Sequence, residues 1–177
     1  MRFALPLAVF IALGALFAFG LTRDPTLIPS PLLDQPLPSF SLPNLADPEE
    51  AVTEQALAGK PALLNIWGSW CAQCGTEHAF LMELARNGVP IVGLNWNDEQ
   101  ASARAWLERL GDPYVVTAVD VEGRVAIDLG VYGAPETFLV DGGGTIIYKY
   151  IGPLTPQVWR DEFMPRLSQL SSGGASD

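Results

Sequence analysis

The stretch Asn65–His78, NIWGSWCAQCGTEH, contains both cysteines of the chain, Cys71 and Cys74. It overlaps a run of apolar side chains, Ala62–Trp67, that is typical of a strand covered on both faces. Apolar side chains then recur at helical spacing from Phe80 onward, which predicts a helix. The pattern therefore places the Cys-x-x-Cys pair between the end of a buried strand and the start of a helix, where open α/β sheets usually carry their sites.

The rest of the chain alternates between strand-like and helix-like segments. The cysteine-bearing helix is expected to end at Asn87-Gly88 and to be followed by a strand at 91–96. A second helix, capped by Asn97 or Asp98 and ended by Gly111, then leads to a strand at 114–120 and a short helix or turn at 124–133. The last expected elements are a hairpin that turns at Gly142–Gly144 and a closing helix at 155–170, made irregular by Pro165. This order predicts an α/β domain with a partly parallel, mixed central sheet flanked by helices.

The N-terminal segment is apolar and uncharged from Phe3 to Leu21. That length is close to the roughly 20 residues that a helix needs to cross a bilayer. We expect an uncleaved transmembrane helix, with a cleaved signal peptide as the alternative, and both imply that the following domain is exported. The expected organisation is a membrane anchor at 1–22, a proline-rich linker at 23–38, a globular domain at 39–170 and a flexible tail at 171–177.

The formal net charge of the chain is −10. Such a chain is not expected to bind nucleic acid, because phosphate neutralisation requires clustered lysine and arginine. Peripheral binding to anionic lipid is disfavoured for the same reason. The charge is compatible with simple solubility, or with steering toward a basic protein partner.

The spacing of the cysteines excludes several roles for the pair. A domain of this size does not need a staple across so short a loop. A structural zinc site requires four ligands, and the chain offers two cysteines and one histidine, so no metal is expected. Attachment of c-type haem requires histidine directly after the second cysteine, whereas Gly75 stands there. A redox-active dithiol, which needs no further cofactor, remains.

The expected position at a helix start assigns different roles to the two thiols. A thiolate at Cys71 would face unpaired amide donors and the positive end of the helix dipole, which lower the pKa of a thiol. We therefore expect Cys71 to be the nucleophile. Cys74 lies one turn inside the helix and is expected to resolve the mixed disulfide formed at Cys71.

Three neighbours of the pair are candidates for tuning it. Trp70 is either a core aromatic residue or a shield at the rim of the cysteines. Glu77 lies three residues after Cys74, so its carboxylate is either a solvated surface group or a neighbour that holds or relays the proton of that thiol. His78 is too far along the helix for direct base catalysis at Cys71 and is expected to be packed or hydrogen-bonded.

Together, NIWGSWCAQCGTEH and the stretch Gly130–Gly144, GVYGAPETFLVDGGG, resemble the thioredoxin-like superfamily. Within it, the chain is similar over nearly its whole length to the DsbE/CcmG family of membrane-anchored thiol:disulfide interchange proteins of cytochrome c biogenesis. The second stretch is the more characteristic of that family. The dipeptide Ala72-Gln73 departs from the family pattern, which often has a proline between the cysteines.

The resemblance implies a thioredoxin-like fold in which Pro135 follows a cis peptide bond and packs against the dithiol. It implies that the backbone before this proline, at Ala134, can pair with an extended substrate. Tyr132, Glu136 and Glu77 match family positions around an acidic groove and become candidates for substrate binding or tuning.

The resemblance further implies a bacterial inner-membrane protein whose catalytic domain lies in the periplasm. Its expected reaction is reduction of the disulfide in Cys-x-x-Cys-His segments of apocytochrome c. The expected partners are apocytochrome c and a membrane-embedded thiol electron donor. The alternatives are a broader exported thioredoxin-like reductase, or a module that binds apocytochrome c without catalysis.

Overall fold

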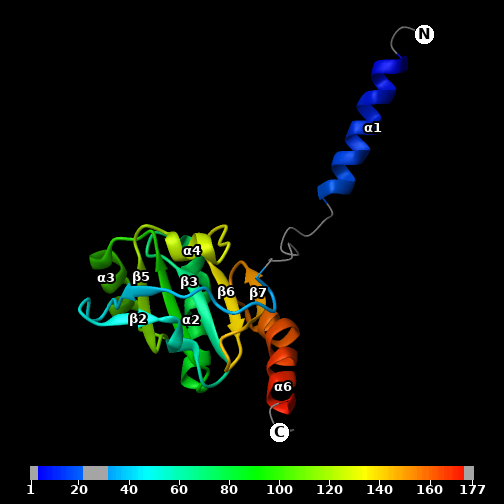
Figure 1. Ribbon diagram of the computed structural model, residues 1–177. Helices are drawn as coiled ribbons and strands as arrows, with labels where there is room; N and C mark the ends of the chain where they lie inside the picture. Colours follow the sequence, from blue (N-terminus) through cyan, green and yellow to red (C-terminus); the bar gives the residue numbers. More distant parts are fainter. Residues whose placement is uncertain (1–3, 22–31, 174–177) are drawn as a thin grey trace.

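The computed structural model describes residues 4–21 and 32–173 (Figure 1). The N-terminal segment forms helix α1, Ala4–Leu21. Among the described residues, no helix is long and apolar enough to cross a membrane. A helix is therefore present where the anchor over 1–22 is expected, but a membrane span is not seen in this part of the chain.

The domain is built on a five-stranded sheet with the strand order β5-β4-β3-β6-β7. Strands β3, β4 and β5 run parallel to one another, and β6 and β7 are antiparallel to their neighbours. The predicted mixed sheet is confirmed. The bounds of the strands are β3 Ala62–Trp67, β4 Ile91–Trp96, β5 Val116–Asp120, β6 Glu136–Val140 and β7 Ile146–Ile151.

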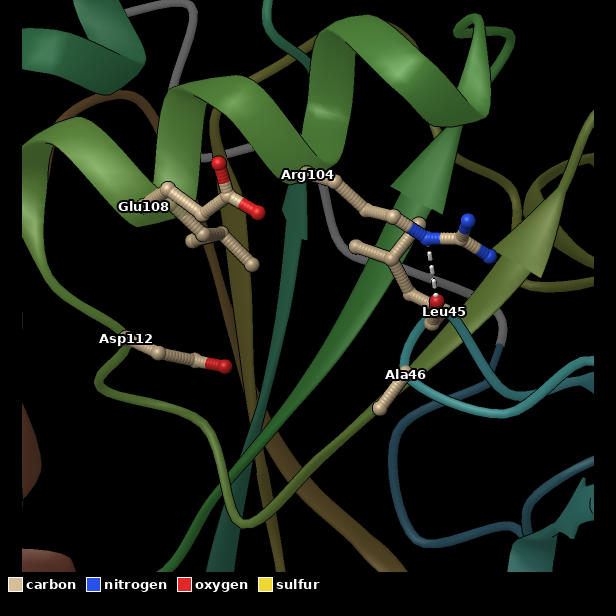
Figure 2. Close-up of a pocket in the computed structure, with 6 residues that line it drawn as sticks. Leu45, Ala46, Arg104, Glu108 and Asp112 are labelled. Carbon is tan, nitrogen blue, oxygen red and sulfur yellow. Dashed lines mark hydrogen bonds between the residues drawn. The ribbon is translucent and has the colours of Figure 1, made fainter.

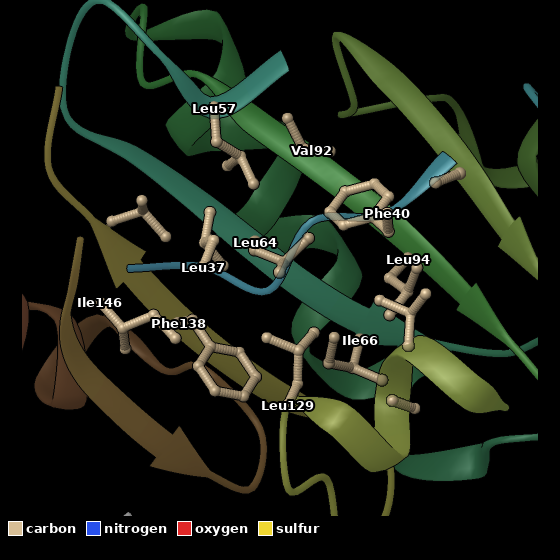
Figure 3. Close-up of a cluster of buried hydrophobic side chains, with 14 of the residues drawn as sticks. Leu37, Phe40, Leu57, Leu64, Ile66, Val92, Leu94, Leu129, Phe138 and Ile146 are labelled. Carbon is tan, nitrogen blue, oxygen red and sulfur yellow. The ribbon is translucent and has the colours of Figure 1, made fainter. Parts of the chain in front are cut away.

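Two apolar layers cover the faces of this sheet, which explains the continuous apolar run of β3. Successive side chains of a strand point to opposite faces, so Leu64 packs in one layer and Leu63 in the other. The first layer lies beneath the N-terminal part of the domain and helix α4 (Figure 3). The second contains side chains from α2 and the C-terminal helices. The helices are α2 Ala72–Arg86, α3 Gln100–Leu110, α4 Arg124–Asp128, α5 Pro156–Val158 and α6 Met164–Gly173.

The N-terminal part of the domain contains elements that the sequence patterns did not predict. A two-stranded antiparallel sheet pairs β1, Ser41–Pro43, with β2, Ala51–Thr53, and a 3-10 turn, η2 Glu54–Leu57, follows it. The segment 32–38, which falls in the expected linker, also packs on the domain. Leu37 is buried in the first apolar layer (Figure 3), so packed chain begins before residue 39.

One expected helix end differs in the structure. The cap of α3 is Glu99, whose carboxylate accepts a hydrogen bond from Ser102 N–H, and the expected cap at Asn97 or Asp98 is wrong. The reason is that the Asp98 carboxylate is engaged with Ser69 and Asn95.

The closing helix contains a π-helical turn, η3 Trp159–Phe163, between α5 and α6. This irregular turn lies just before Pro165, which lacks an N–H group and whose ring crowds the carbonyl four residues earlier in an α-helix.

Candidate active site

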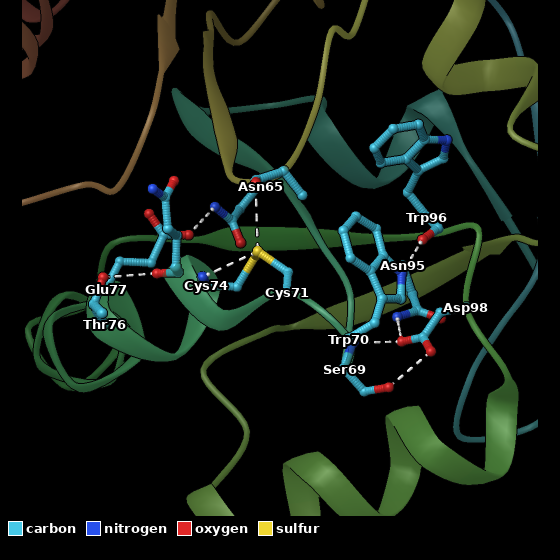
Figure 4. The surroundings of a disulfide bond; sticks show 12 residues. Asn65, Ser69, Trp70, Cys71, Cys74, Thr76, Glu77, Asn95, Trp96 and Asp98 are labelled. Carbon is cyan, nitrogen blue, oxygen red and sulfur yellow. Dashed lines mark hydrogen bonds between the residues drawn. A yellow bond between two sulfur atoms is a disulfide. The ribbon is translucent and has the colours of Figure 1, made fainter.

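The two cysteines form a disulfide at the N-terminus of α2 (Figure 4). Cys71 is the N-cap residue, and its Sγ accepts a hydrogen bond from Cys74 N–H at 3.1 Å. Cys71 is 6% exposed and Cys74 is 2% exposed. In the reduced protein the Cys74 amide is therefore placed to stabilise a thiolate on Cys71, the more exposed of the two residues.

The loop opposite the disulfide carries the expected cis-proline. The Ala134–Pro135 peptide bond is cis, and Pro135 is buried directly before β6. The carbonyl oxygen of Ala134 lies 3.3 Å from Cys71 Sγ. Among the described residues, no backbone acceptor for the Ala134 N–H is found. Beside the nucleophilic sulfur there is thus a backbone amide that an extended chain can pair with.

Two aromatic side chains, one directly before Cys71 and one in the loop before Pro135, are exposed. Trp70, directly before Cys71, is 52% exposed, and its Nε1–H donates to the carbonyl oxygen of Trp96 at 3.2 Å. Its ring packs edge-on against Trp96. Tyr132, two residues before Ala134, is 62% exposed. Trp70 is therefore a rim residue rather than a core residue.

Glu77 lies in the second turn of α2 and is buried, with 2% of its surface exposed. Its Oε1 accepts a hydrogen bond from Asn65 Nδ2 at 2.9 Å, and its Oε2 accepts one from Leu154 N–H at 2.6 Å. Burial outweighs these two hydrogen bonds and raises the pKa of Glu77 from 4.5 to about 7. Glu77 therefore does not line the groove but is a titratable group one turn behind Cys74.

Glu136, the first residue of β6, is completely buried. Its Oε1 accepts hydrogen bonds from Tyr132 N–H at 2.7 Å and Gly133 N–H at 3.2 Å. Its Oε2 lies 2.9 Å from Lys149 Nζ. Burial prevents Glu136 from contacting a substrate directly, so of the three polar groove candidates only Tyr132 is placed to do so.

His78 has the structural environment expected from the sequence. Its Nε2 lies 3.0 Å from the carbonyl oxygen of Gly111, and its ring packs edge-on against Trp106. Burial lowers its pKa, and because a carbonyl oxygen can only accept, Nε2–H is the donor in the contact with Gly111.

Sequence reasoning did not assign to the site three polar residues around the disulfide and the cis-proline loop. Asp98 accepts hydrogen bonds from the N–H and Oγ–H of Ser69 at 2.6 and 2.7 Å, which fixes the loop before Trp70 (Figure 4). Asn65 links Glu77 to Tyr114 from within β3. The third, Lys149, faces the loop before Pro135. The sequence signal that could have indicated these residues is a polar residue inside, or just after, an otherwise apolar strand.

The pocket drawn in Figure 2 lies apart from these residues. It has a volume of about 370 Å³ and is lined by side chains of α3 and the segments next to it, among them Arg104, Glu108 and Asp112. Arg104 Nε donates to the carbonyl oxygen of Leu45 across it. None of the predicted site residues lines this pocket. Across residues 4–21 and 32–173, no cluster of side chains suited to a metal ion occurs.

A disulfide at a strand–helix junction, facing a cis-proline loop on a mixed sheet, defines a thiol:disulfide oxidoreductase of thioredoxin-like fold. The sequence profile of the Redoxin family matches residues 32–162. The chain belongs to this family and, within it, to the DsbE thiol:disulfide interchange proteins.

Three DsbE relatives illustrate the match. The protein from Allochromatium vinosum is 49% identical and aligns over 97% of this chain and 96% of its own length. Those from Pseudomonas aeruginosa and Escherichia coli are 45% and 41% identical, over 94% and 97% of this chain and 92% and 96% of their own. Among solved structures, the thio-disulfide isomerase from Thermus thermophilus has a TM-score of 0.63 at 25% identity, covering 78% of this chain and 96% of its own.

Proposed function

We propose that this oxidoreductase reduces the disulfide of Cys-x-x-Cys-His haem-binding segments in apocytochrome c. The observation that carries this proposal is the position of the Ala134 backbone beside the nucleophilic sulfur. The carbonyl oxygen of Ala134 lies 3.3 Å from Cys71 Sγ, and the N–H of the same residue is available for pairing. An extended segment paired with that edge brings its own disulfide to Cys71. Trp70, directly before Cys71, and Tyr132, in the loop before Pro135, supply exposed aromatic surface.

The reaction proceeds by two exchanges at sulfur. The Cys71 thiolate attacks one sulfur of the substrate disulfide and forms a mixed disulfide, and the other substrate sulfur leaves as a thiolate. The Cys74 thiolate then attacks Cys71 Sγ, which closes the Cys71–Cys74 disulfide and releases the second substrate sulfur. Two electrons pass to the substrate, and its two thiolates take up the two protons that the cysteines gave up. Glu77, behind Cys74, is positioned to influence the proton of the resolving thiol.

The reducing direction follows from the chemistry of the exported compartment. A Cys-x-x-Cys-His segment exposed to oxidants tends to close into a disulfide and loses the thiols that haem attachment requires. We propose that residues 1–22 anchor the domain to the outer face of a bacterial inner membrane, in the periplasm. A membrane-embedded thiol donor then returns the Cys71–Cys74 pair to the reduced state.

Two other functions lead to different outcomes. A broader exported reductase would act equally on unrelated proteins, and a module that only holds apocytochrome c would not need its cysteines. Replacement of Cys71 by alanine distinguishes the binding module from the reductase, because a module that only binds apocytochrome c keeps its function without the thiol.

The proposed function is tested in cells. A strain that lacks this protein, or that carries Cys71→Ala, should lose holocytochrome c, and an added small-molecule thiol should partly restore it. Haem staining of membrane fractions measures the effect, with the wild-type gene on a plasmid as the control. Normal holocytochrome c in the deletion strain, with no redundant reductase present, would overturn the proposal.

A further inference from the structure

Lys149 has an environment that is unusual for a lysine. It lies in β7, and its side chain is 4% exposed. Lysine is almost never buried to this extent unless its charge is paired. Among residues 4–21 and 32–173, the polar and aromatic groups that approach its ammonium, apart from the ring of Phe138, belong to the segment between Gly130 and Glu136.

The contacts of the ammonium define how that segment is held. Lys149 Nζ donates to the carbonyl oxygen of Gly130 at 2.6 Å. It pairs with Glu136 Oε2 at 2.9 Å, and the same nitrogen lies 4.6 Å from the centre of the Tyr132 ring. A cation over the face of an aromatic ring is attracted by the ring quadrupole. Lys149 thus contacts both ends of the loop that carries Ala134.

Glu136 continues this arrangement into the loop backbone. Its Oε1 accepts from the N–H groups of Tyr132 and Gly133, the two residues before Ala134. Hydrogen bonds to a charged acceptor are about twice as strong as those between neutral groups. The ammonium of Lys149, 2.9 Å from Glu136 Oε2, offsets part of the cost of burying this carboxylate.

We propose that Lys149 is a positioning residue for thiol:disulfide exchange with polypeptides: by pairing with Glu136 and Gly130 it fixes the loop so that the Ala134 backbone faces Cys71. This inference rests on the proposed pairing of an extended substrate with that backbone. The new element is that Lys149, a residue of β7 that contacts neither the substrate nor the cysteines, holds the Ala134 backbone in the position that pairing requires.

The inference predicts that polypeptide and small disulfides respond differently to a change at Lys149. A polypeptide must pair with the Ala134 edge before its sulfurs are aligned with Cys71, whereas a small aromatic disulfide needs access to Cys71 only. Misplacement of a binding group by about 1 Å can cost up to about 100-fold in rate. The loss of Lys149 should therefore raise KM for a peptide and leave the reaction with the small disulfide unchanged.

The test compares Lys149→Met with wild type, each fully reduced and freed of reductant beforehand, in single-turnover reduction of two substrates, where KM and kcat stand for the half-saturating substrate concentration and the limiting rate. One is an oxidised peptide containing Cys-x-x-Cys-His, and the other is 5,5′-dithiobis(2-nitrobenzoate). We expect KM for the peptide to rise roughly tenfold, kcat to change little, and the rate with the small disulfide to stay within about twofold. Lys149→Arg keeps the cation and should restore most of the peptide affinity. The matched control is Arg124→Gln, which breaks an exposed ion pair.

If Lys149→Met does not fold, Lys149→Met/Glu136→Gln is used. This double variant buries no charge at the site, yet Gly130 loses its donor and the loop keeps only neutral hydrogen bonds. We expect the same selective rise in peptide KM, to a smaller extent. An equal loss with both substrates, or no change with either, would overturn the positioning role.

A second oxidised peptide, in which alanine replaces the histidine, separates this inference from the proposed function. If wild type reduces both peptides equally well, the specific substrate is wrong, while either peptide still decides the role of Lys149.

Discussion

Glu77, in the helix that carries Cys74, and Glu136, directly after the cis-proline, are both buried carboxylates, and they differ in what compensates their charge. Glu77, in α2, accepts hydrogen bonds from neutral donors, the Asn65 amide and the Leu154 N–H. Glu136, in β6, has two backbone donors and also the ammonium of Lys149. Neutral donors do not offset the desolvation of Glu77, whose pKa rises to about 7. One carboxylate is therefore a titratable group behind the thiols, and the other is one half of a structural ion pair.

The largest effect is expected from removing the cation at Glu136. Lys149→Met leaves a carboxylate with no exposed surface and without its counter-charge, and breaking a buried pair in this way costs about 3–5 kcal/mol. Urea unfolding at pH 7 measures the free energy of unfolding, with Lys149→Arg as the control that keeps the charge. A loss below about 1 kcal/mol would mean that the pair resembles an exposed one.

The next effect concerns Glu77 and depends on pH. In the unfolded chain this carboxyl has a pKa of 4.5 and in the folded protein a pKa of about 7, so between these values the folded state holds more protons. The contribution of Glu77 to the free energy of unfolding therefore falls as pH rises through this window, by up to about 3 kcal/mol. Glu77→Gln cannot ionise, so its stability relative to wild type should increase from pH 5 to pH 8.

Unfolding curves of both proteins at several pH values between 5 and 8 test this prediction. The difference between the two proteins isolates Glu77 from the other titrating groups. A difference that does not change with pH would show that Glu77 stays ionised in the fold, as a carboxylate with a cationic partner does.

A third carboxylate, Asp98, extends the comparison to the Trp70 side of the disulfide. It is 9% exposed and accepts from Ser69 and Asn95. Asp98→Ala leaves these donors without their partner, at a cost of about 1–3 kcal/mol. Exposure of the indole of Trp70, followed by fluorescence quenching, should increase as the loop loses its attachment. An unchanged quenching constant would show that Asp98 does not fix this loop.

The smallest effect is expected for the exposed pair of Arg124 and Glu122, in which Arg124 Nε lies 2.7 Å from Glu122 Oε2. Surface ion pairs contribute about 0–1 kcal/mol because water and salt screen them. Glu122→Gln should change the urea midpoint by little, and the change should disappear in 1 M salt. A loss as large as that of Lys149→Met would break the contrast between buried and exposed pairs.

The sequence patterns predicted the elements that depend on local signals. The apolar runs at β3 and β4 and the Gly142–Gly144 turn were found because strand burial and turn chemistry are encoded nearby. The β1–β2 pair was missed because its strands have three residues each and Pro43 interrupts their pattern.

The burial of the site carboxylates was beyond a reading of local patterns. Glu77 is joined to Leu154, 77 positions away in the sequence, and no periodicity in α2 indicates that contact. Glu136 owes its environment to Lys149 of β7, which pairs in register with Phe138 and reaches the Glu136 carboxylate through its side chain. Cys71, Cys74 and Pro135 were identified because a short motif carries their chemistry, whereas the polar groups around them depend on tertiary contacts.

The most direct test of the account is to trap the exchange intermediate. Reduced Cys74→Ser is mixed with an oxidised apocytochrome c peptide containing Cys-x-x-Cys-His, and the covalent products are mapped by mass spectrometry. We expect a mixed disulfide between Cys71 and the peptide that persists because no resolving thiol is present, and no such product with Cys71→Ser. Equal trapping through Cys74 in Cys71→Ser, or no adduct with Cys74→Ser, would contradict the assignment of Cys71 as the nucleophile that opens this substrate.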